Sequence, residues 1–341
     1  MTSESATPKA RFPSEPGSRE LARSAARTRL IGALLVFSSS IAFSTKAILV
    51  KLAYRQGIDS VSLLALRFGF AAPFFAYAAF GDRLRLSLRL RLRLPSRVPS
   101  RLTRREGTAI VALGVLGYYL ASLSDFIGLR YISAGLERLI LFVYPTLVVV
   151  IEAGLFEIRL QRRQKLALFI TYAGIFLAFR GELGSLGSDV PRGALWVFGS
   201  ALTYAMYLIG AGQMIPKLGS QRFTGLSLLS ATGAVLIHAL LSGAHLFDLP
   251  PVAYGIGLVM ALFATVLPAF LLTRGIALIG SGPAAIISTV GPVSTILLAY
   301  LFLEEALSPT EFLGTALVVV GATLVASGPK HAKPLAPPPA A

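Results

Sequence analysis

Charged side chains stand inside stretches of sequence that are otherwise apolar. An ionisable group costs about 2.5–3.5 kcal/mol at the centre of a bilayer on insertion scales, so each such group is a functional hypothesis. Cations and carboxylates in this setting are suited to binding a charged solute, or to exchanging ion-pair partners during a conformational change. Five of these residues lie toward the outer ends of the first four apolar runs: Lys46, Arg67, Asp125, Glu137 and Arg138.

We expect these five side chains to gather in the outer half of the membrane, with a formal net charge of +1. By helical rise, Lys46 lies roughly 10 Å and Arg67 about 12 Å from the outer ends of their helices, too deep to reach the interface easily. Asp125 and Glu137 are also candidates for coupling to protons. Two alternatives stay open: a static ion-pair network, and snorkelling of the shallower groups to the interface.

Aromatic residues are further candidates for contact with a substrate. Tyr118 and Tyr144 belong to the first half of the chain, and Tyr204 and Tyr207 belong to the second. Their rings suit stacking and their hydroxyls suit hydrogen bonding. For each tyrosine taken singly, simple packing is the competing interpretation.

Two prolines interrupt apolar runs at matched places, Pro145 and Pro292. A proline removes a helical hydrogen bond and frees the carbonyl four residues before it, here at Leu141 and Ser288. In lipid such carbonyls must find partners or face a cavity. We therefore predict that both prolines act as hinges beside a binding site; a structural kink without ligand contact is the alternative.

The residue inventory excludes several chemistries. The chain has no cysteine and only three histidines, and it contains neither an HExxH motif nor a GxxxxGK[ST] phosphate-binding loop. We therefore expect no catalytic residue, no metal site, no cofactor and no ATPase activity within the chain.

Composition places the protein in a bilayer. Of 341 residues, 55% are hydrophobic and 14% are charged, against roughly 25% charged residues in soluble domains. The net charge of +16 does not indicate nucleic-acid binding, because the basic residues lie between hydrophobic runs, as membrane topology requires.

The sequence predicts an all-α integral membrane protein with ten transmembrane helices. A crossing needs roughly 20 mostly apolar residues. Ten runs approach that length: 30–53, 59–80, 108–128, 134–155, 166–180, 193–213, 223–243, 253–278, 282–302 and 309–327.

Orientation follows from the basic residues between these runs. With both termini in the cytoplasm, 23 Lys and Arg residues fall on the cytoplasmic side and five on the other side, a strong positive-inside signal. The predicted organisation is a disordered basic tail (1–29), a first five-helix repeat (30–181) with a basic cytoplasmic loop (81–106), a second repeat (193–328) and a Pro/Ala-rich tail (329–341).

The two halves are copies of one another. Residues 128–181 align without a gap on residues 275–328, and matched pairs include Gly128 with Gly275 and Gly174 with Gly321. The starts of the halves also correspond, since GALLVFSSS at 32–40 resembles GALWVFGSA at 193–201. An odd number of helices per copy makes the repeat inverted, an architecture typical of transporters. We expect Gly174 and Gly321 to allow tight helix packing.

The copies disagree at the charges. Glu137 and Arg138 align with Ala284 and Ala285, Asp125 aligns with Leu272, and Lys46 aligns with Tyr207. The halves therefore share a scaffold, and any charged recognition is carried mainly by the first copy.

The basic loop 81–106 alternates as RLRLSLRLRLRL. One interpretation is an interfacial ribbon that puts Leu into lipid and Arg onto anionic headgroups. The other is a solvated low-complexity loop that only sets topology.

The chain resembles the drug/metabolite transporter superfamily, in its ten-helix EamA-type branch. The resemblance rests on SLLALRF at 62–68, YISAGLERLILFVYP at 131–145, the acids Glu157 and Glu304, and the paired glycines. It covers about residues 30–328, and it implies a central cavity with the fifth and tenth helices peripheral. Ile158–Arg159, the Arg-Leu loop and both tails depart from the family pattern.

The leading functional prediction is a secondary active transporter that exports small metabolites, such as amino acids or related polar or amphipathic solutes, by alternating access. The expected partners are a small-molecule substrate, the lipid bilayer and a coupling proton or other ion, in a monomer or homodimer of a bacterial inner membrane. The alternatives are an intramembrane enzyme and a non-transporting receptor or assembly factor.

Overall fold

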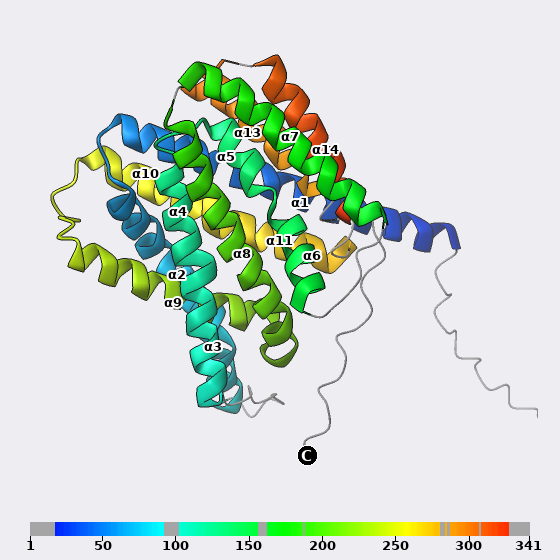
Figure 1. Cartoon of the computed structure of the whole chain (residues 1–341). Coiled ribbons are helices and arrows are strands. Elements are labelled where there is room, and N and C mark those ends of the chain that lie inside the picture. The colour runs from blue at the N-terminus through cyan, green and yellow to red at the C-terminus, as the bar shows by residue number, and fades with distance from the viewer. Residues whose placement is uncertain are drawn as a thin grey trace, which may run out of the picture.

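The computed structural model describes residues 18–91, 102–155, 162–186, 188–279, 284, 287–306 and 308–326, and within these ranges every regular element is a helix. The predicted tail 329–341, the turn around Glu157 and the middle of the Arg-Leu loop lie outside the described residues. Figure 1 shows the elements. In chain order they are α1 (Ser18–Arg55), α2 (Ser60–Arg91), α3 (Arg104–Gly114), η1 (Val115–Leu120), α4 (Ala121–Gly128), α5 (Ala134–Leu141), α6 (Tyr144–Leu155), α7 (Arg162–Leu186), α8 (Val190–Leu218), α9 (Ser220–Leu241), α10 (Pro251–Ala261), η2 (Leu262–Val266), α11 (Leu267–Ile279), α13 (Val290–Leu303) and α14 (Pro309–Ala326).

The predicted spans fall on these helices, and the all-helical class is confirmed for the described residues. Seven helical stretches there are long and apolar enough to cross a membrane: Ala26–Arg55, Ser60–Gly81, Arg104–Gly128, Ala134–Leu155, Val190–Leu218, Ser220–Leu241 and Pro251–Ile279. Two shorter apolar helices follow, at Val290–Leu303 and Pro309–Leu324. The helix at the fifth predicted span, α7, is outside both groups, so a count of ten crossings stays a prediction.

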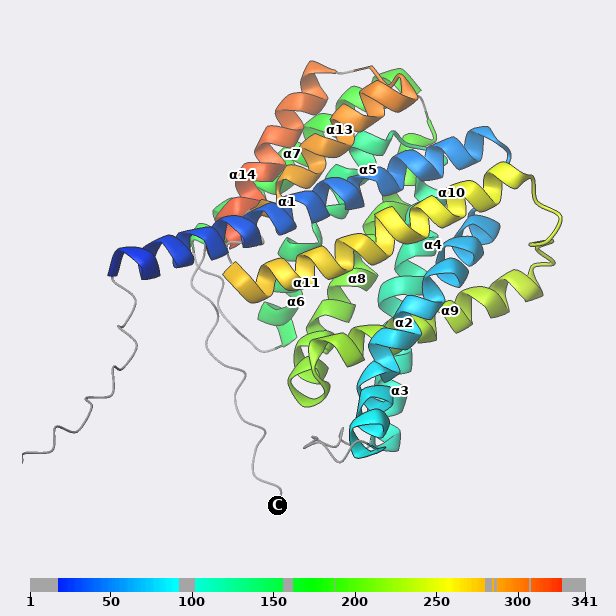
Figure 2. The ribbon, with the colours of Figure 1, turned by 180° about the vertical axis from the view of Figure 1, so that it is seen from behind.

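Helices that correspond in the two copies pack against each other. The pairs α2 with α9 and α7 with α14 are in contact, and α5 of the first copy contacts α13 of the second, which is the equivalent of α6. The first helix of each copy packs instead on the third helix of the other copy: α1 lies along α11, and α8 lies along α4. Figure 2 shows α1 side by side with α10 and α11. This is the pairing that a two-fold relation between the copies requires.

Matched glycines allow the contacts between the copies, of α1 with α11 and of α8 with α4. A Cβ added at Gly128 would lie 2.9 Å from the carbonyl oxygen of Gly193 on α8. In the other copy, a Cβ added at Gly275 would lie 3.0 Å from the carbonyl oxygen of Gly32 on α1. Small residues let helix backbones approach this closely. The two sequence matches, between Gly128 and Gly275 and between Gly32 and Gly193, are thus two copies of one helix crossing.

The predicted packing role of Gly174 and Gly321 is confirmed. A Cβ at Gly174 would lie 2.6 Å from the carbonyl oxygen of Gly314, and a Cβ at Gly321 would lie 2.9 Å from that of Ala167. The two glycines therefore seat α7 and α14 directly against each other. The pair runs along one side of the molecule in Figure 1, as the resemblance implied for the fifth and tenth helices.

One helix in each copy contains a π-helical turn. The segments η1 (Val115–Leu120) and η2 (Leu262–Val266) widen the third helix of each copy. Val115 and Leu262 are separated by 147 positions, the offset that aligns the repeats. π-Helical turns are rare and occur frequently at functional sites, and the sequence analysis did not predict them.

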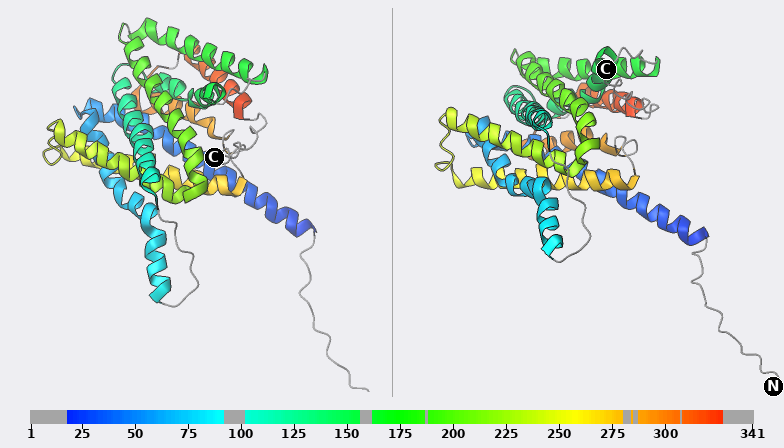
Figure 3. Two further views of the ribbon diagram at one scale, coloured as in Figure 1. Left: turned by 60° about the horizontal axis from the view of Figure 1, so that its bottom comes forward. Right: turned by 90° about the horizontal axis from the view of Figure 1, so that it is seen from below.

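The start of α1, the end of α2 and the start of α3 differ from the predicted boundaries of the basic tail and the basic loop. The chain is already helical from Ser18, where a disordered tail to residue 29 was expected, and α2 continues to Arg91, into the predicted loop 81–106. Leu and Arg are good helix formers, and the first proline after Pro73 is Pro95. The loop also ends earlier than predicted, because a Thr103–Glu106 capping box begins α3 at Arg104. Figure 3 shows both α1 and α2 projecting from the bundle.

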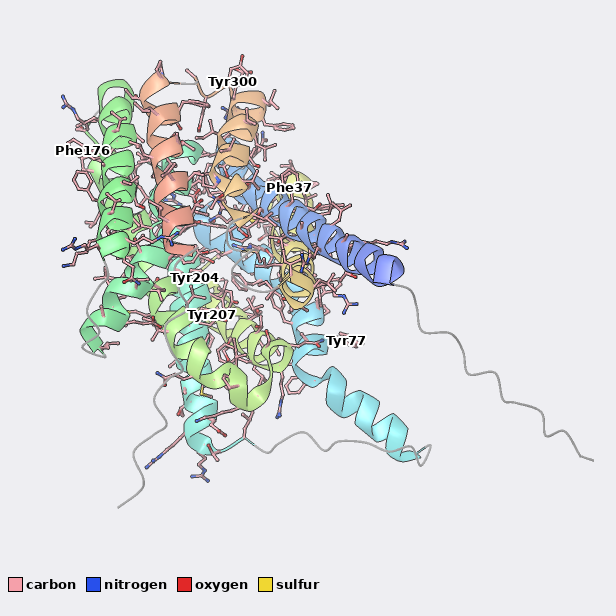
Figure 4. All side chains as sticks on the ribbon, turned by 90° about the vertical axis from the view of Figure 1, so that its right-hand side faces the viewer. Phe37, Tyr77, Phe176, Tyr204, Tyr207 and Tyr300 are labelled. Atoms are coloured by element: carbon pink, nitrogen blue, oxygen red, sulfur yellow. The ribbon has the colours of Figure 1, made fainter. Side chains whose placement is uncertain are left out.

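Large apolar side chains cover the outside of the bundle. Phe37, Phe176 and Tyr300 are each more than two-fifths exposed, and they lie around the periphery in Figure 4, whereas Tyr204 and Tyr207 lie on α8 further inside. An apolar exterior of this kind suits lipid as the surrounding solvent.

Candidate functional site

Three of the predicted residues form one buried ionic cluster. Lys46 Nζ lies 2.6 Å from Asp125 Oδ2 and 2.9 Å from Glu137 Oε1. The side chains are 6%, 2% and 0% exposed. Snorkelling of Asp125 and Glu137 to the interface is therefore wrong, because both carboxylates are enclosed by protein. We call Lys46, Asp125 and Glu137 the charge triad.

The triad joins α1, α4 and α5. Ser133 begins α5 by accepting a hydrogen bond from the Leu136 amide at 3.0 Å, and this places Glu137 in the first buried turn. Two carboxylates share one ammonium group, so the triad has a formal charge of −1. Asp125 Oδ1 and Glu137 Oε2 are buried and have no hydrogen-bond partner among the described residues. Each carboxylate thus retains an oxygen that can accept a proton or a donor group.

Arg138 lies next to the triad but outside its ion pairs. Its guanidinium carbon is 5.0 Å from the ring centre of Phe43 and 6.0 Å from that of Phe142. The residue is 7% exposed, and its Nε has no hydrogen-bond partner among the described residues. A Cβ added at Gly291 would meet Arg138 Nη2 at 2.6 Å. The first turn of α13 therefore approaches the guanidinium closely, and a side chain at position 291 would have to displace the end of Arg138.

Arg67 is placed apart from the triad. Its Nε donates to Thr265 Oγ1 at 2.8 Å, and its guanidinium carbon lies 5.8 Å from the ring centre of Phe126, the residue that follows Asp125. Arg67 Nη1 is buried without a hydrogen-bond partner among the described residues. The predicted gathering of five charges is thus a triad flanked by two separate guanidinium groups.

The four predicted tyrosines form one aromatic cluster. The ring centres of Tyr144 and Tyr204 are 5.1 Å apart, those of Tyr204 and Tyr207 are 5.8 Å apart, and those of Tyr207 and Tyr118 are 4.8 Å apart. Tyr207 OH donates to Tyr118 OH at 3.1 Å. Tyr204 and Tyr207 are labelled in Figure 4. The cluster connects α6, α8 and η1 across the two copies.

The chain leaves helical structure just before each predicted hinge proline. Helix α5 ends at Leu141, and α6 starts at Tyr144 with Pro145 as its second residue. In the other copy Thr289 precedes α13, and Pro292 lies in its first turn. The predicted interruptions are confirmed, but they stand at the start of a half-helix and not in mid-helix. Ser44 on α1 donates to the Gly291 carbonyl at 2.9 Å, so the second break contacts the first copy.

Thr265 is a site residue that the sequence analysis missed. It stands in η2 at the position equivalent to Tyr118 in η1, 147 residues earlier. Each π-helical turn therefore presents a hydroxyl to the other copy: Tyr118 contacts Tyr207, and Thr265 contacts Arg67. Adding the repeat offset of 147 to the position of Tyr118 leads to Thr265, and this is the sequence signal that could have identified it.

A helical, apolar chain with two structural copies and an incompletely paired internal charge cluster defines a multi-pass membrane protein of the transporter type. The family model of the "EamA-like transporter family" matches residues 30–180 and 191–327. The chain belongs to the EamA-like transporter family and is a membrane transporter.

Similar proteins carry the same description. The uncharacterised transporter YcbK of Bacillus subtilis is 28% identical over 293 residues, which is 84% of this chain and 90% of that protein. The uncharacterised transporter sll1319 of Synechocystis is 28% identical over 204 residues, 59% of this chain and 61% of that protein. A solved crystal structure shares the fold with a TM-score of 0.57 at 15% identity, covering 86% of this chain and 95% of that one.

Proposed function

We propose that this protein is a secondary active transporter that exports small polar or amphipathic metabolites, such as amino acids or related solutes, by alternating access. The observation that carries the proposal is the charge triad, where two buried carboxylates share one lysine and each keeps an unpartnered oxygen. A buried acceptor without a hydrogen-bond partner costs about 1–3 kcal/mol, and more when it is charged, so a purely structural cluster would be expected to satisfy its oxygens fully.

The architecture supports movement of one copy against the other. The proposal includes ten crossings arranged as two inverted five-helix repeats, with both termini in the cytoplasm and the chain in a bacterial inner membrane. The exchanged pairs α1–α11 and α8–α4 tie each copy to the other. The break before Pro292 lies beside Arg138 and Ser44, and Phe142 in the break before Pro145 has its ring centre 6.0 Å from the Arg138 guanidinium carbon. A rearrangement of the half-helices would therefore alter the site.

Recognition of the substrate would use the groups that lack partners. Arg138 Nε and Arg67 Nη1 are donors for an anionic or carbonyl group, and the unpartnered oxygens of Asp125 and Glu137 are acceptors for a cationic one. The aromatic cluster of Tyr118, Tyr144, Tyr204 and Tyr207 would contact the apolar part of the solute. This combination suits a solute with both charges and an apolar body.

Coupling to an ion would use the triad. A proton on Glu137 or Asp125 leaves Lys46 paired with the other carboxylate, and removal of that proton draws Lys46 back between the two. A protein that binds proton and substrate in alternation at such a cluster links their two gradients.

The proposal is tested by flux into proteoliposomes that contain the purified chain. We expect uptake of a labelled metabolite across an imposed gradient, and dependence of that uptake on a proton gradient when the substrate is at equal concentration on both sides. A folded protein that moves none of a broad panel of amino acids and related solutes would contradict transport, and would favour a receptor, an assembly factor or an enzyme.

A further inference from the structure

A second polar site lies at the end of the bundle where α1 ends and α2 begins, which we call the Gly57 end. A cavity of about 560 Å³ opens there, within the size range of small-molecule sites. It is bounded by the last turn of α1, the turn to α2, the end of α4 and the segment after α13. Its charged or polar walls are Lys51, Tyr54, Arg55, Asp59, Arg130 and Glu305.

Both carboxylates of this cavity are already engaged by the backbone. Asp59 Oδ1 accepts hydrogen bonds from the amides of Val61 at 2.8 Å and Ser62 at 3.0 Å, at the start of α2. Burial alone would raise the pKa of Asp59, but hydrogen bonds from Ser62 and Val61 outweigh it and lower the pKa. Glu305 accepts from the Ala134 amide at 3.1 Å, at the start of α5. Both acids thus cap helices and keep their negative charge, so that with the three cations of the cavity the formal net charge is +1.

The three cations keep donors for a ligand. Lys51 Nζ is 3.7 Å from Glu305, a long ion pair. Arg55 uses Nη2 to donate to the Leu303 carbonyl, which leaves the other edge of its guanidinium group. Arg130 lies over the ring of Tyr54 at 5.4 Å and makes no ion pair with a described residue. Two guanidinium groups and an ammonium group around one cavity match the oxygens of a phosphate group.

We propose that this cavity is a binding site for a phosphate-bearing anion, separate from the charge triad. Lys51 is five residues beyond Lys46 on α1, or roughly 7.5 Å along the helix axis, so the two sites are stacked and not shared. The phosphate comes either from a soluble phosphorylated metabolite or from an anionic lipid headgroup, because the cavity stands at the ends of membrane helices. Binding here does not depend on the proposed transport, since it is measured at equilibrium.

The experiment compares the full chain with two variants in neutral detergent. Titration calorimetry with inorganic phosphate and with glycerol 3-phosphate measures the soluble source. Native mass spectrometry after reconstitution with phosphatidylglycerol, and with phosphatidylcholine as the reference lipid, measures the lipid source. The test variant is the double substitution Lys51→Gln with Arg130→Gln. The control is Arg192→Gln, because Arg192 is likewise exposed and lies over a tyrosine ring, Tyr131, at 4.8 Å.

We expect the double variant to weaken binding of the favoured phosphate compound by about tenfold or more, as loss of charge-assisted hydrogen bonds requires, while Arg192→Gln binds like the parent. Loss seen with glycerol 3-phosphate assigns a soluble ligand, and loss seen only with phosphatidylglycerol assigns the lipid. Absence of binding to either compound by the parent protein overturns the proposal. So does an equal loss in the Arg192 control. A thermal melt of each variant identifies any that fails to fold, and single substitutions then replace the pair.

Discussion

At the scale of residues, the three buried cations of the predicted site divide into one that is paired with two carboxylates and two that make no ion pair with a described residue. Lys46 holds Asp125 and Glu137, whereas Arg67 donates to a threonine and Arg138 lies between phenylalanine rings. The second copy has Tyr207, Leu272, Ala284 and Ala285 at the places of Lys46, Asp125, Glu137 and Arg138. The ionic site is therefore a property of the first copy alone, and substitutions in it should separate transport from folding.

We expect Lys46→Met to abolish transport and to destabilise the protein by about 3–5 kcal/mol, because it leaves two carboxylates buried without a cation. Adding Asp125→Asn and Glu137→Gln should restore much of the stability, since no uncompensated charge then remains, without restoring flux. Thermal unfolding in detergent and proteoliposome uptake measure the two effects. If Lys46→Met transports substrate as fast as the unsubstituted protein, the triad has a structural role and not a role in transport.

Arg67 and Thr265 are hydrogen-bonded to each other, and replacing each residue separately distinguishes their roles. Arg67→Ala should remove transport while the protein still inserts in the membrane, as judged by yield in the membrane fraction. Thr265→Val deletes only the hydroxyl that accepts from Arg67 Nε, and leaving that donor unsatisfied should cost about 1–3 kcal/mol of stability. If Arg67→Ala transports normally, the residue serves packing and not recognition.

At the scale of elements, each copy contains a broken helix, and one helix from each copy joins a single pair held together at glycines. The breaks precede Pro145 and Pro292, and the locked pair is α7 with α14. A broken helix has few backbone bonds to lose when it bends, whereas glycine contacts between backbones resist separation. We infer that the former move and the latter stay rigid.

Replacing Pro145 or Pro292 with alanine should change the rate of transport more than the affinity for substrate. Alanine restores an amide that can rejoin the half-helices, so the interconversion between states slows while the binding groups stay in place. Initial uptake rates over a range of substrate concentrations separate the maximal rate from the half-saturating concentration. A change confined to the latter contradicts the hinge.

Gly174→Ala should destabilise the protein by several kcal/mol, because its Cβ would lie 2.6 Å from a backbone oxygen of α14 that cannot move alone. Gly233→Ala in α9 is the matched control: a Cβ there meets nothing within 4 Å, and the change should stabilise the helix by up to about 1 kcal/mol. Melting temperatures of both variants in one detergent make the comparison. Equal effects would mean that the α7–α14 contact is loose.

At the scale of the whole molecule, hydrogen bonds between the copies cross the Gly57 end. Glu305 and Leu303, after and within α13, accept from Ala134 of α5 and Arg55 of α1. Any state that opens this end must break these bonds. They are few and partly solvated, so they are suited to a gate.

We expect Glu305→Ala to shift the protein towards a state open at the Gly57 end. Spin labels on Gln56→Cys and Ala306→Cys report the separation, and the absence of native cysteine makes these labels specific. The control is Glu304→Ala, which removes a neighbouring, exposed acid. If the distance distribution stays unchanged with Glu305→Ala, or changes equally in both variants, the Glu305 contact does not control opening of this end.

The sequence predicted the helices from hydropathy and the repeat from matched Gly and Pro, and it singled out five charges, of which three form the charge triad. It could not predict which carboxylates Lys46 would hold, since that depends on how α1, α4 and α5 meet. The sequence analysis also missed that residues 18–29 and 81–91 are helical. A hydropathy scan finds segments apolar enough to lie in lipid, and it does not find polar extensions of the same helices. The π-helical turns were missed because their apolar content matches that of an ordinary helix.

Those π-helical turns also record an order of events. Because η1 and η2 keep the repeat offset without a gap, we infer that the half that was duplicated already contained the wide turn. On that order, the difference between Lys46 and Tyr207 arose after the duplication.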